Sequence, residues 1–218
     1  MTTPEKAQAA DALSNEPAVR RGRPALFDPD RVVEQVADLF WARGYDGVSI
    51  SDITEATGLS KSSLYNSFGG KDALFGRALA RYHAQTVKAG ANWLAAEDGS
   101  DPMDKLDQLL SGPANDVHGQ NDARGCFLCN TSADGLGRSP DTDTLVGEGF
   151  AVLEAGLTAL FRRHAPDAPS DTLRDAARLA LTTYTGLRVR SRARPSRAEL
   201  DSVRRATVSA VRSILKET

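Results

Sequence analysis

Apolar residues recur along most of the chain at the three- and four-residue spacing of amphipathic helices. The first such stripe follows Asp28-Pro29, a pair that suits the cap and the first position of a helix, and Gly44 ends it. No segment shows the strict alternation of a half-buried strand, and no internal repeat is found. The pattern therefore predicts an all-α protein.

Later helices are predicted from the same spacing and from local capping signals. Ser49, with Asp52 three residues on, resembles a capping box, and Ser196 with Glu199 forms another. After the first helix we expect, in order, short helices capped by Ser49 and Ser60, then helices over 71 to about 96, 102–111, 126 to about 136, about 142–163 and 170 to about 192, and a last helix after Ser196. Residues 111–124 are predicted to form a loop because they are rich in Gly, Pro, Asn and Asp.

Residues 47–75 carry the pattern that points most directly to a function. Two short helical segments are joined by a tight turn at Thr57-Gly58-Leu59. In a helix-turn-helix the first helix braces the second, which lies in the major groove and presents hydrogen-bonding side chains to bases and phosphates. The side chains predicted to contact DNA here are Ser49, Ser51, Lys61, Ser62, Ser63, Tyr65, Asn66 and Lys71.

Charge restricts where nucleic acid can bind. The chain of 218 residues has a formal net charge of −2, so no overall basic balance supports DNA binding. A local basic segment, Arg20-Arg21-Gly22-Arg23, follows a tail at 1–19 that we expect to be disordered. Contact with DNA should therefore be confined to one end of the molecule. We find no apolar run near 18 residues and no signal-peptide pattern, and expect a cytoplasmic protein without a membrane partner.

The segment from about Asp28 to Phe75 resembles the N-terminal domain of the TetR/AcrR family of transcriptional regulators. The matching motifs are ARGY at 42–45, VSI at 48–50, DI at 52–53, GLSK at 58–61, LY at 64–65, Phe68 and KDALF at 71–75. Gly69-Gly70 departs from the Pro-Ser often found before the next helix, and Asn66-Ser67 from a common aromatic or His, which bears on the operator sequence. The arginine segment resembles a minor-groove hook, the alternative being a solvated charged tail.

The resemblance implies a DNA-binding domain at 20–75 and a ligand-binding and dimerisation domain at 76–218, with a homodimer on a palindromic operator. The apolar stripes of the last two helices are too extended for a monomer surface, and the residues expected to pair are Leu173, Ala177, Tyr184, Leu200, Val203 and Val211. The residues expected to line an effector pocket are Tyr82, His83, Trp93, Phe127 and Phe150, although ordinary core packing explains any one of them.

Cys126 and Cys129 share a helix face, and three interpretations stay open. Both can pack as small apolar residues. They can sense oxidants or electrophiles, because a thiol near a helix N-terminus is more reactive, and Arg124 could assist. A metal site with His118 or His83 is the third, although these spacings match no ligand motif. Beyond this set we expect neither a metal nor a cofactor.

The sequence thus predicts a DNA-binding transcriptional regulator, most simply a repressor released by a small molecule or by thiol oxidation or alkylation. Two alternatives were weighed: a thiol oxidoreductase using Cys126-x-x-Cys129, and an effector-independent nucleoid-type DNA binder. The oxidoreductase motif usually follows a strand, and none is predicted. No catalytic triad, phosphate loop or carboxylate pair is present either, so we expect no enzyme.

Overall fold

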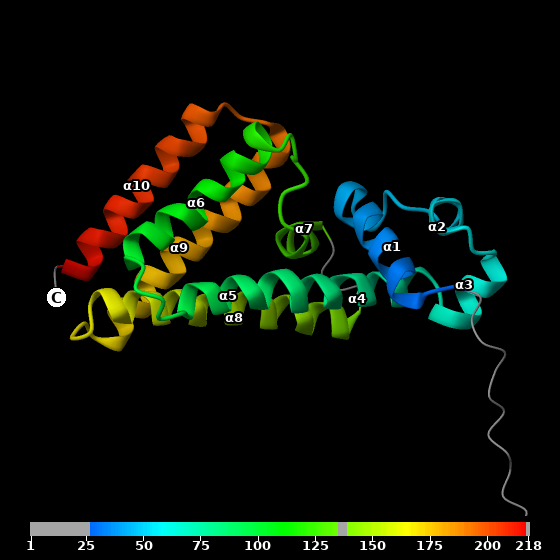
Figure 1. Ribbon diagram of the computed structural model, residues 1–218, viewed down its shortest axis with the longest axis horizontal. Coiled ribbons are helices and arrows are strands. Elements are labelled where there is room, and N and C mark those ends of the chain that lie inside the picture. The colour runs from blue at the N-terminus through cyan, green and yellow to red at the C-terminus, as the bar shows by residue number, and fades with distance from the viewer. Residues whose placement is uncertain (1–26, 135–138, 217–218) are drawn as a thin grey trace, which may run out of the picture.

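The computed structural model describes residues 27–134 and 139–216, and within these ranges every regular element is a helix (Figure 1). The all-α prediction is confirmed. The elements are α1 Pro29–Arg43, α2 Ile50–Thr57, α3 Lys61–Phe68, α4 Lys71–Tyr82, η1 His83–Val87, α5 Lys88–Ala95, α6 Pro102–Gly119, α7 Phe127–Asp134, α8 Pro140–His164, α9 Ser170–Arg190, η2 Ser191–Ala193 and α10 Arg197–Lys216.

The N-terminal head consists of α1, α2 and α3 packed against the start of α4. Its helices begin where the sequence places their caps: the Asp28 carboxylate accepts from Asp30 N at 3.0 Å, and Ser60 Oγ accepts from Ser63 N at 3.1 Å. Ser49 and Asp52 form a complete capping box. The side chains that fill the core of the head are Val32, Val36, Phe40, Val48, Ile53, Leu64, Phe68 and Leu74.

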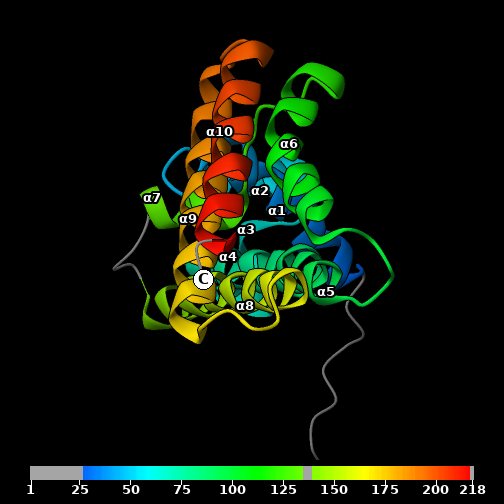
Figure 2. The same cartoon turned by 90° about the vertical axis from the view of Figure 1, so that its left-hand side faces the viewer.

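A continuous helical rod of α4, η1 and α5 leads from the head into the rest of the molecule. The predicted long helix is confirmed, but its middle, His83–Val87, is a π-helical turn. The rod lies along α8, and the two backbones come close at Gly156, where an added Cβ would lie 2.8 Å from the carbonyl oxygen of Ala91. Helices α6, α9 and α10 rise from one side of the α5/α8 pair (Figure 1 and Figure 2).

Helix α6 is longer than predicted. It continues through Pro113 to Gly119, so the loop expected at 111–124 begins only after it. Pro113, Ala114 and Val117 are buried, and Asp116 forms an ion pair with Arg188 of α9. The composition of the segment indicates only its weak helix propensity, and these tertiary contacts outweigh that propensity.

Helix α8 is the single helix within the described ranges that is long and apolar enough in composition to cross a membrane, with a window of mean hydropathy 1.4. The sequence interpretation expected no such run. One face of α8 buries Leu153, Leu157 and Leu160 in the core cluster, and a core helix of a globular protein meets the same criterion. We therefore interpret α8 as a core helix.

Four of the six residues expected at a dimer interface are buried in the core of the chain itself. Leu173, Ala177, Leu200 and Val211 are at most 2% exposed, because the apolar stripes of α9 and α10 pack against each other and against neighbouring helices. Val203 is half-buried. These stripes are therefore core, and the prediction that they face a partner is wrong for the four buried residues.

Candidate functional site

Helix α3 separates an inner face from an outer one. Leu64 and Phe68 are buried, whereas Lys61, Ser62, Tyr65 and Asn66 are exposed. Tyr65 is 47% exposed, which is unusual for a large aromatic side chain. The four outer side chains supply an ammonium, two hydroxyls and an amide, which are groups that pair with bases and phosphates. The structure thus brings these predicted DNA contacts onto one exposed face.

Three of the four remaining predicted DNA contacts within the described residues have partners in the head itself. Ser63 serves the cap of α3 through its backbone N–H, and its hydroxyl lies 2.8 Å from that of Ser60. Ser49 donates its backbone N–H to Asp52 at 2.7 Å. The Lys71 ammonium lies 4.0 Å from the centre of the Tyr45 ring. Ser51 is exposed beside the cap of α2.

The head is acidic apart from its outer face. Residues 27–75 contain four basic and eight acidic side chains, a formal charge of −4. The hydrogen bond from the Ser49 hydroxyl, the main cause, holds the pKa of Asp52 below its ordinary value, so that this carboxylate stays charged. Lys61 is the one cation in α3. The predicted arginine contacts, Arg20, Arg21 and Arg23, lie outside the described residues.

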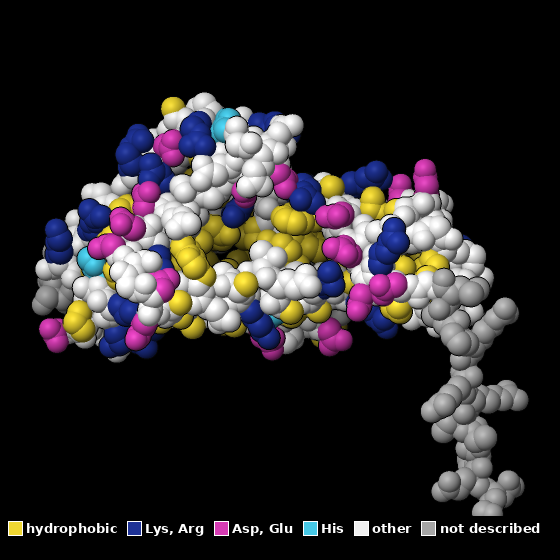
Figure 3. Space-filling view, in the orientation of Figure 1, with side chains coloured by type: hydrophobic (Ala, Val, Ile, Leu, Met, Phe, Trp, Pro, Cys, Tyr) yellow, Lys and Arg dark blue, Asp and Glu magenta, His cyan; other side chains and the backbone are white. Residues whose placement is uncertain are grey.

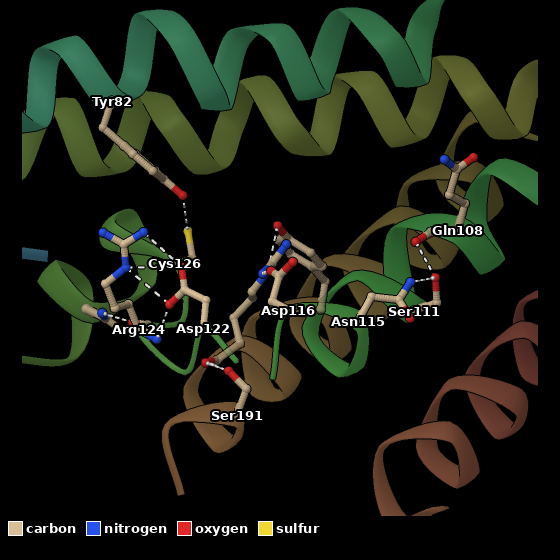
Figure 4. Close-up of polar contacts among 12 residues, drawn as sticks. Tyr82, Gln108, Ser111, Asn115, Asp116, Asp122, Arg124, Cys126 and Ser191 are labelled. Atoms are coloured by element: carbon tan, nitrogen blue, oxygen red, sulfur yellow. Dashed lines mark hydrogen bonds and ion pairs between the residues drawn. The ribbon is translucent and has the colours of Figure 1, made fainter. Parts of the chain in front are cut away.

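A second polar constellation is buried behind the head, around Cys126. This residue immediately precedes α7, and its carbonyl accepts the Asn130 N–H at 2.8 Å, as the carbonyl of a helix cap does. Tyr82 reaches across from α4 and donates its hydroxyl to Cys126 Sγ at 3.4 Å (Figure 4). Cys126 is 4% exposed and Cys129 is 1% exposed.

The hydrogen bonds at Cys126 favour its ionised form. The thiol of Cys129 is the main donor and, with Tyr82 and the backbone N–H of Cys129, lowers the pKa of Cys126 to about 6 against the opposing effect of burial. The same interaction raises the pKa of Cys129, which stays protonated as the donor. Burial raises the pKa of Tyr82 as well. The two cysteines are therefore inequivalent, with the nucleophilic character on Cys126.

Tyr184 and Arg188 of α9 complete this thiol cluster, and the sequence interpretation missed their role. Tyr184 was expected at a dimer interface, but its hydroxyl accepts from Arg188 Nε at 3.0 Å, and burial raises its pKa to about 12. Arg188 also pairs with Asp116 and stabilises negative charge on Cys126. Arg188 is one of several arginines in its segment, and only tertiary structure distinguishes the inward-facing one.

Aromatic and ionic contacts join the thiol cluster to the head. The Tyr82 ring lies 5.2 Å from Trp41 of α1 and 5.7 Å from Phe127, which in turn lies 5.6 Å from Phe75. Arg124, two residues before Cys126, stacks 4.0 Å above Trp41 and pairs with Asp38 of α1 at 2.9 Å. A displacement at Cys126 would therefore change two sets of contacts with α1: the ring contact between Tyr82 and Trp41, and the contacts of Arg124 with Trp41 and Asp38.

The cluster lies near hollows in the surface. A groove of about 180 Å³ between α1 and α4 is lined in part by Trp41, Tyr82 and Phe127. On the face shown in Figure 3 the surface is also hollowed between α5, α6 and α7, and hydrophobic side chains line this hollow. Tyr82 and Phe127, both predicted at an effector site, thus adjoin the thiols.

The other predicted effector residues lie elsewhere. Trp93 is half-buried at the far end of α5, where Lys105 Nζ lies 5.6 Å from its ring centre. His83 is 5% exposed within the π-helical turn, close to Gly149 of α8, and its Nε2 has no partner. Phe150 packs against the core. Among the described residues no three His, Cys, Asp or Glu side chains form a possible metal site, which disfavours the metal interpretation of the cysteines.

Comparisons with known proteins agree with this geometry. Residues 33–78 match the family model for bacterial regulatory proteins of the tetR family. The transcriptional repressor ComR of Escherichia coli K12 is 34% identical over 110 residues, 50% of this chain and 52% of that protein. The repressor DhaR of Mycobacterium sp. strain GP1 is 30% identical over 124 residues, 56% and 58% of the two chains. The chain thus spans about half the length of the curated relatives it matches.

A solved structure extends the likeness over most of the chain. It is a cysteine mutant of the TetR-family regulator CifR in complex with 26-base-pair operator DNA. The two chains are 26% identical, with a TM-score of 0.68, over 89% of this chain and 98% of the other. The helix-turn-helix head, the larger helical domain and these likenesses agree: residues 33–78 form a DNA-binding head of the tetR family of bacterial regulatory proteins, and most of the chain resembles a DNA-binding regulator of that family.

Proposed function

We propose that this protein is a cytoplasmic repressor that binds a palindromic operator as a homodimer and releases it when Cys126 is modified. The observation that carries the proposal is the hydrogen bond that the Tyr82 hydroxyl donates to the buried Cys126 Sγ at 3.4 Å. Core packing alone does not require a buried thiol that accepts from a tyrosine and has a guanidinium, that of Arg188, close enough to favour its ionised form. The exposed face of α3 supports the DNA-binding part of the proposal.

The ligand class follows from the chemistry of the thiol. A thiolate adds to soft electrophiles such as quinones: a sulfur–carbon bond forms, the ring electrons move to the quinone oxygen, and that oxygen takes up a proton. The groove lined in part by Trp41, Tyr82 and Phe127 offers a small planar molecule aromatic surfaces next to Tyr82, whose hydroxyl donates to the buried sulfur. Oxidation by peroxide to a sulfenic acid, with the peroxide reduced to water, is the other reaction that this thiol supports.

Release would follow from the contacts between the thiol cluster and α1. An adduct on Cys126 has no room beside a sulfur that is 4% exposed, so Tyr82 or the segment before α7 must move. Tyr82 contacts Trp41, and Arg124 pairs with Asp38, so either movement changes how the head is held. Because linkage is reciprocal, operator DNA should disfavour a reversible modification of Cys126 by the same factor by which that modification weakens DNA binding at equilibrium.

A second copy of the chain is proposed to pack on the outer faces of α9 and α10. Two of the three exposed large hydrophobic side chains in the described residues, Leu179 and Val189, lie on α9. The neighbouring outer face of α10 has small residues that allow close approach: Ser202, Ala206, Ser209, Ala210 and Ser213. Such a dimer would present two α3 helices to successive major grooves.

The test compares Cys126→Ser with Cys129→Ser in an operator-binding titration before and after treatment with benzoquinone or hydrogen peroxide. We expect the wild type and Cys129→Ser to release DNA and Cys126→Ser to stay bound. The alkylation rate of Cys126 by iodoacetamide should rise with a midpoint near pH 6, because its pKa is lowered to about 6. Equal release of all three proteins would refute the thiol mechanism while leaving the DNA-binding function intact.

A further inference from the structure

The turn between α9 and α10 holds a dense run of arginines. Residues 188–197 contain five arginines and no acidic residue. Arg188 faces inward to the thiol cluster, whereas Arg190, Arg192, Arg194 and Arg197 are exposed. In a chain with a net charge of −2, such a run is a local exception that neither the helix-turn-helix nor the thiol cluster explains.

This turn is held to α6 and to the loop after α6 by neutral groups. Arg194 Nη1 donates to Asn121 Oδ1 at 2.8 Å, and Arg197 Nη2 donates to Asn115 Oδ1 at 2.8 Å. Asn121 and Arg194 have φ angles of 56° and 51° and are the two non-glycine residues with positive φ in the described part of the chain. Amide partners position a guanidinium without neutralising it, so the positive charge stays available.

These arginines border a polar cleft of about 520 Å³ at the joint between the head and the larger domain. Arg192 and Arg194 line it from the turn, Arg124 and Asn121 from the loop before α7, and Ala42 from α1. Asp122 is the acidic residue in the lining, and its oxygens already accept from Arg124 at 2.8 to 3.1 Å.

Arg192 is the free cation of this cleft. Its side chain makes no hydrogen bond or ion pair with any residue in 27–134 or 139–216. The residue before it, Ser191, is buried. Its Cγ lies 3.5 Å from the position that a Cβ on Gly125 would occupy, so its stem is placed against the segment that leads to Cys126. Arg194 retains N–H donors beyond the one that it gives to Asn121.

We propose that this cleft binds a small molecule carrying linked phosphates, with Arg192 and Arg194 as its main ligands. Each guanidinium can donate two parallel hydrogen bonds to the oxygens of one phosphate. Two guanidiniums in one cleft therefore suit a ligand with two linked phosphates better than a ligand with a single phosphate. Asp122 balances Arg124 within the lining, so the net positive charge of the lining comes from the two turn arginines, and Asp38, which lies outside the lining, lowers the local charge by one.

The site is separate from the thiol cluster but shares a segment with it. Arg124 lines the cleft and holds Asp38 of α1, and Gly125 and Cys126 follow it directly. A bound polyanion would therefore act on the same joint as a modified thiol, from the outside of the molecule. The regulator would thus read two unrelated signals.

Isothermal titration of the full-length protein with pyrophosphate at low ionic strength tests this site. We expect saturable binding that weakens at least about tenfold in Arg192→Gln and in Arg194→Gln, because each loses a charge-assisted pair. The matched control is Arg174→Gln, which removes the same charge near the other end of α9, where Arg174 pairs with the exposed Asp171. Circular dichroism should show all three variants folded.

The proposal fails if the wild type does not bind pyrophosphate, or if Arg174→Gln weakens binding as much as the turn variants do. It also fails if the turn variants lose operator affinity while pyrophosphate does not bind, because the arginines would then contact DNA. Cys126→Ser should bind pyrophosphate like the wild type, so this result is independent of the thiol mechanism.

Discussion

Gly125 lies in the segment that links the thiol cluster to the joint, and we expect its replacement by alanine to lower stability measurably. Its φ is +75°, and a Cβ there would lie 2.7 Å from the carbonyl oxygen of Arg188 and 3.3 Å from Asn130 Oδ1. The left-handed conformation costs an alanine about 1–2 kcal/mol. Overpacking against a backbone that cannot turn aside costs typically about 1–3 kcal/mol.

Alanine also reduces the conformational entropy of the unfolded chain, which offsets only about 0.4–1 kcal/mol of this destabilisation. We therefore expect Gly125→Ala to lower the free energy of unfolding by roughly 2–4 kcal/mol. Urea denaturation followed by circular dichroism measures this, provided that the slope with denaturant stays unchanged. Gly119→Ala is the matched control, because nothing lies within 4 Å of its Cβ position and its φ is not positive. Equal stability of the two variants would refute the packing argument at Gly125.

Three further changes test the remaining parts of the molecule. Lys105→Met should lower the free energy of unfolding by roughly 1–3 kcal/mol in urea titrations, because Lys105 Nζ binds two backbone carbonyls, those of residues 93 and 96, as well as the Asp98 carboxylate. The hydrogen bond from Lys105 lowers the pKa of Asp98, so the difference in stability between wild type and Lys105→Met should shrink as pH falls below about 4. A difference that grows in acid would contradict this assignment. Leu179→Glu should yield monomers in light scattering, and a persisting dimer would place the interface elsewhere. Glutamine at the three arginines within 20–23 should reduce the salt dependence of operator binding by about 2–3 in log–log slope, whereas Lys61→Ala should reduce it by about 1.

Helix starts and the exposed face of α3 were predictable because both depend on neighbours in sequence. A serine followed by an acidic residue three positions on sets the cap of α2 by itself, and the outer positions of α3 follow from where Leu64 and Phe68 must be buried. These features require no knowledge of the remaining fold. The family motifs fall in the same stretch, so resemblance and local chemistry gave the same answer.

Features that depend on distant partners were not predictable. The end of α6 was placed too early because Pro113 and Gly112 suggest a loop, while the ion pair between Asp116 and Arg188 joins residues far apart in sequence. The apolar stripes of α9 and α10 indicated buried faces correctly, but a stripe cannot say whether it is covered by the same chain or by another. For this reason the stripe placed Tyr184 at a dimer interface, whereas the structure shows that its hydroxyl accepts from Arg188 of the same chain.

The π-helical turn at His83–Val87 sets how α4 is rotated relative to α5 about their common axis. A π turn accommodates one residue more than an α-helical turn, and one residue corresponds to about 100° of rotation and 1.5 Å of rise in an α-helix. The side of α4 that holds α1 and the side of α5 that packs on α8 are therefore set against each other by this single widened turn. Conversion of this turn into regular α-helix would turn the head about the rod axis relative to α5, and in the proposed dimer this would change the spacing of the two α3 helices.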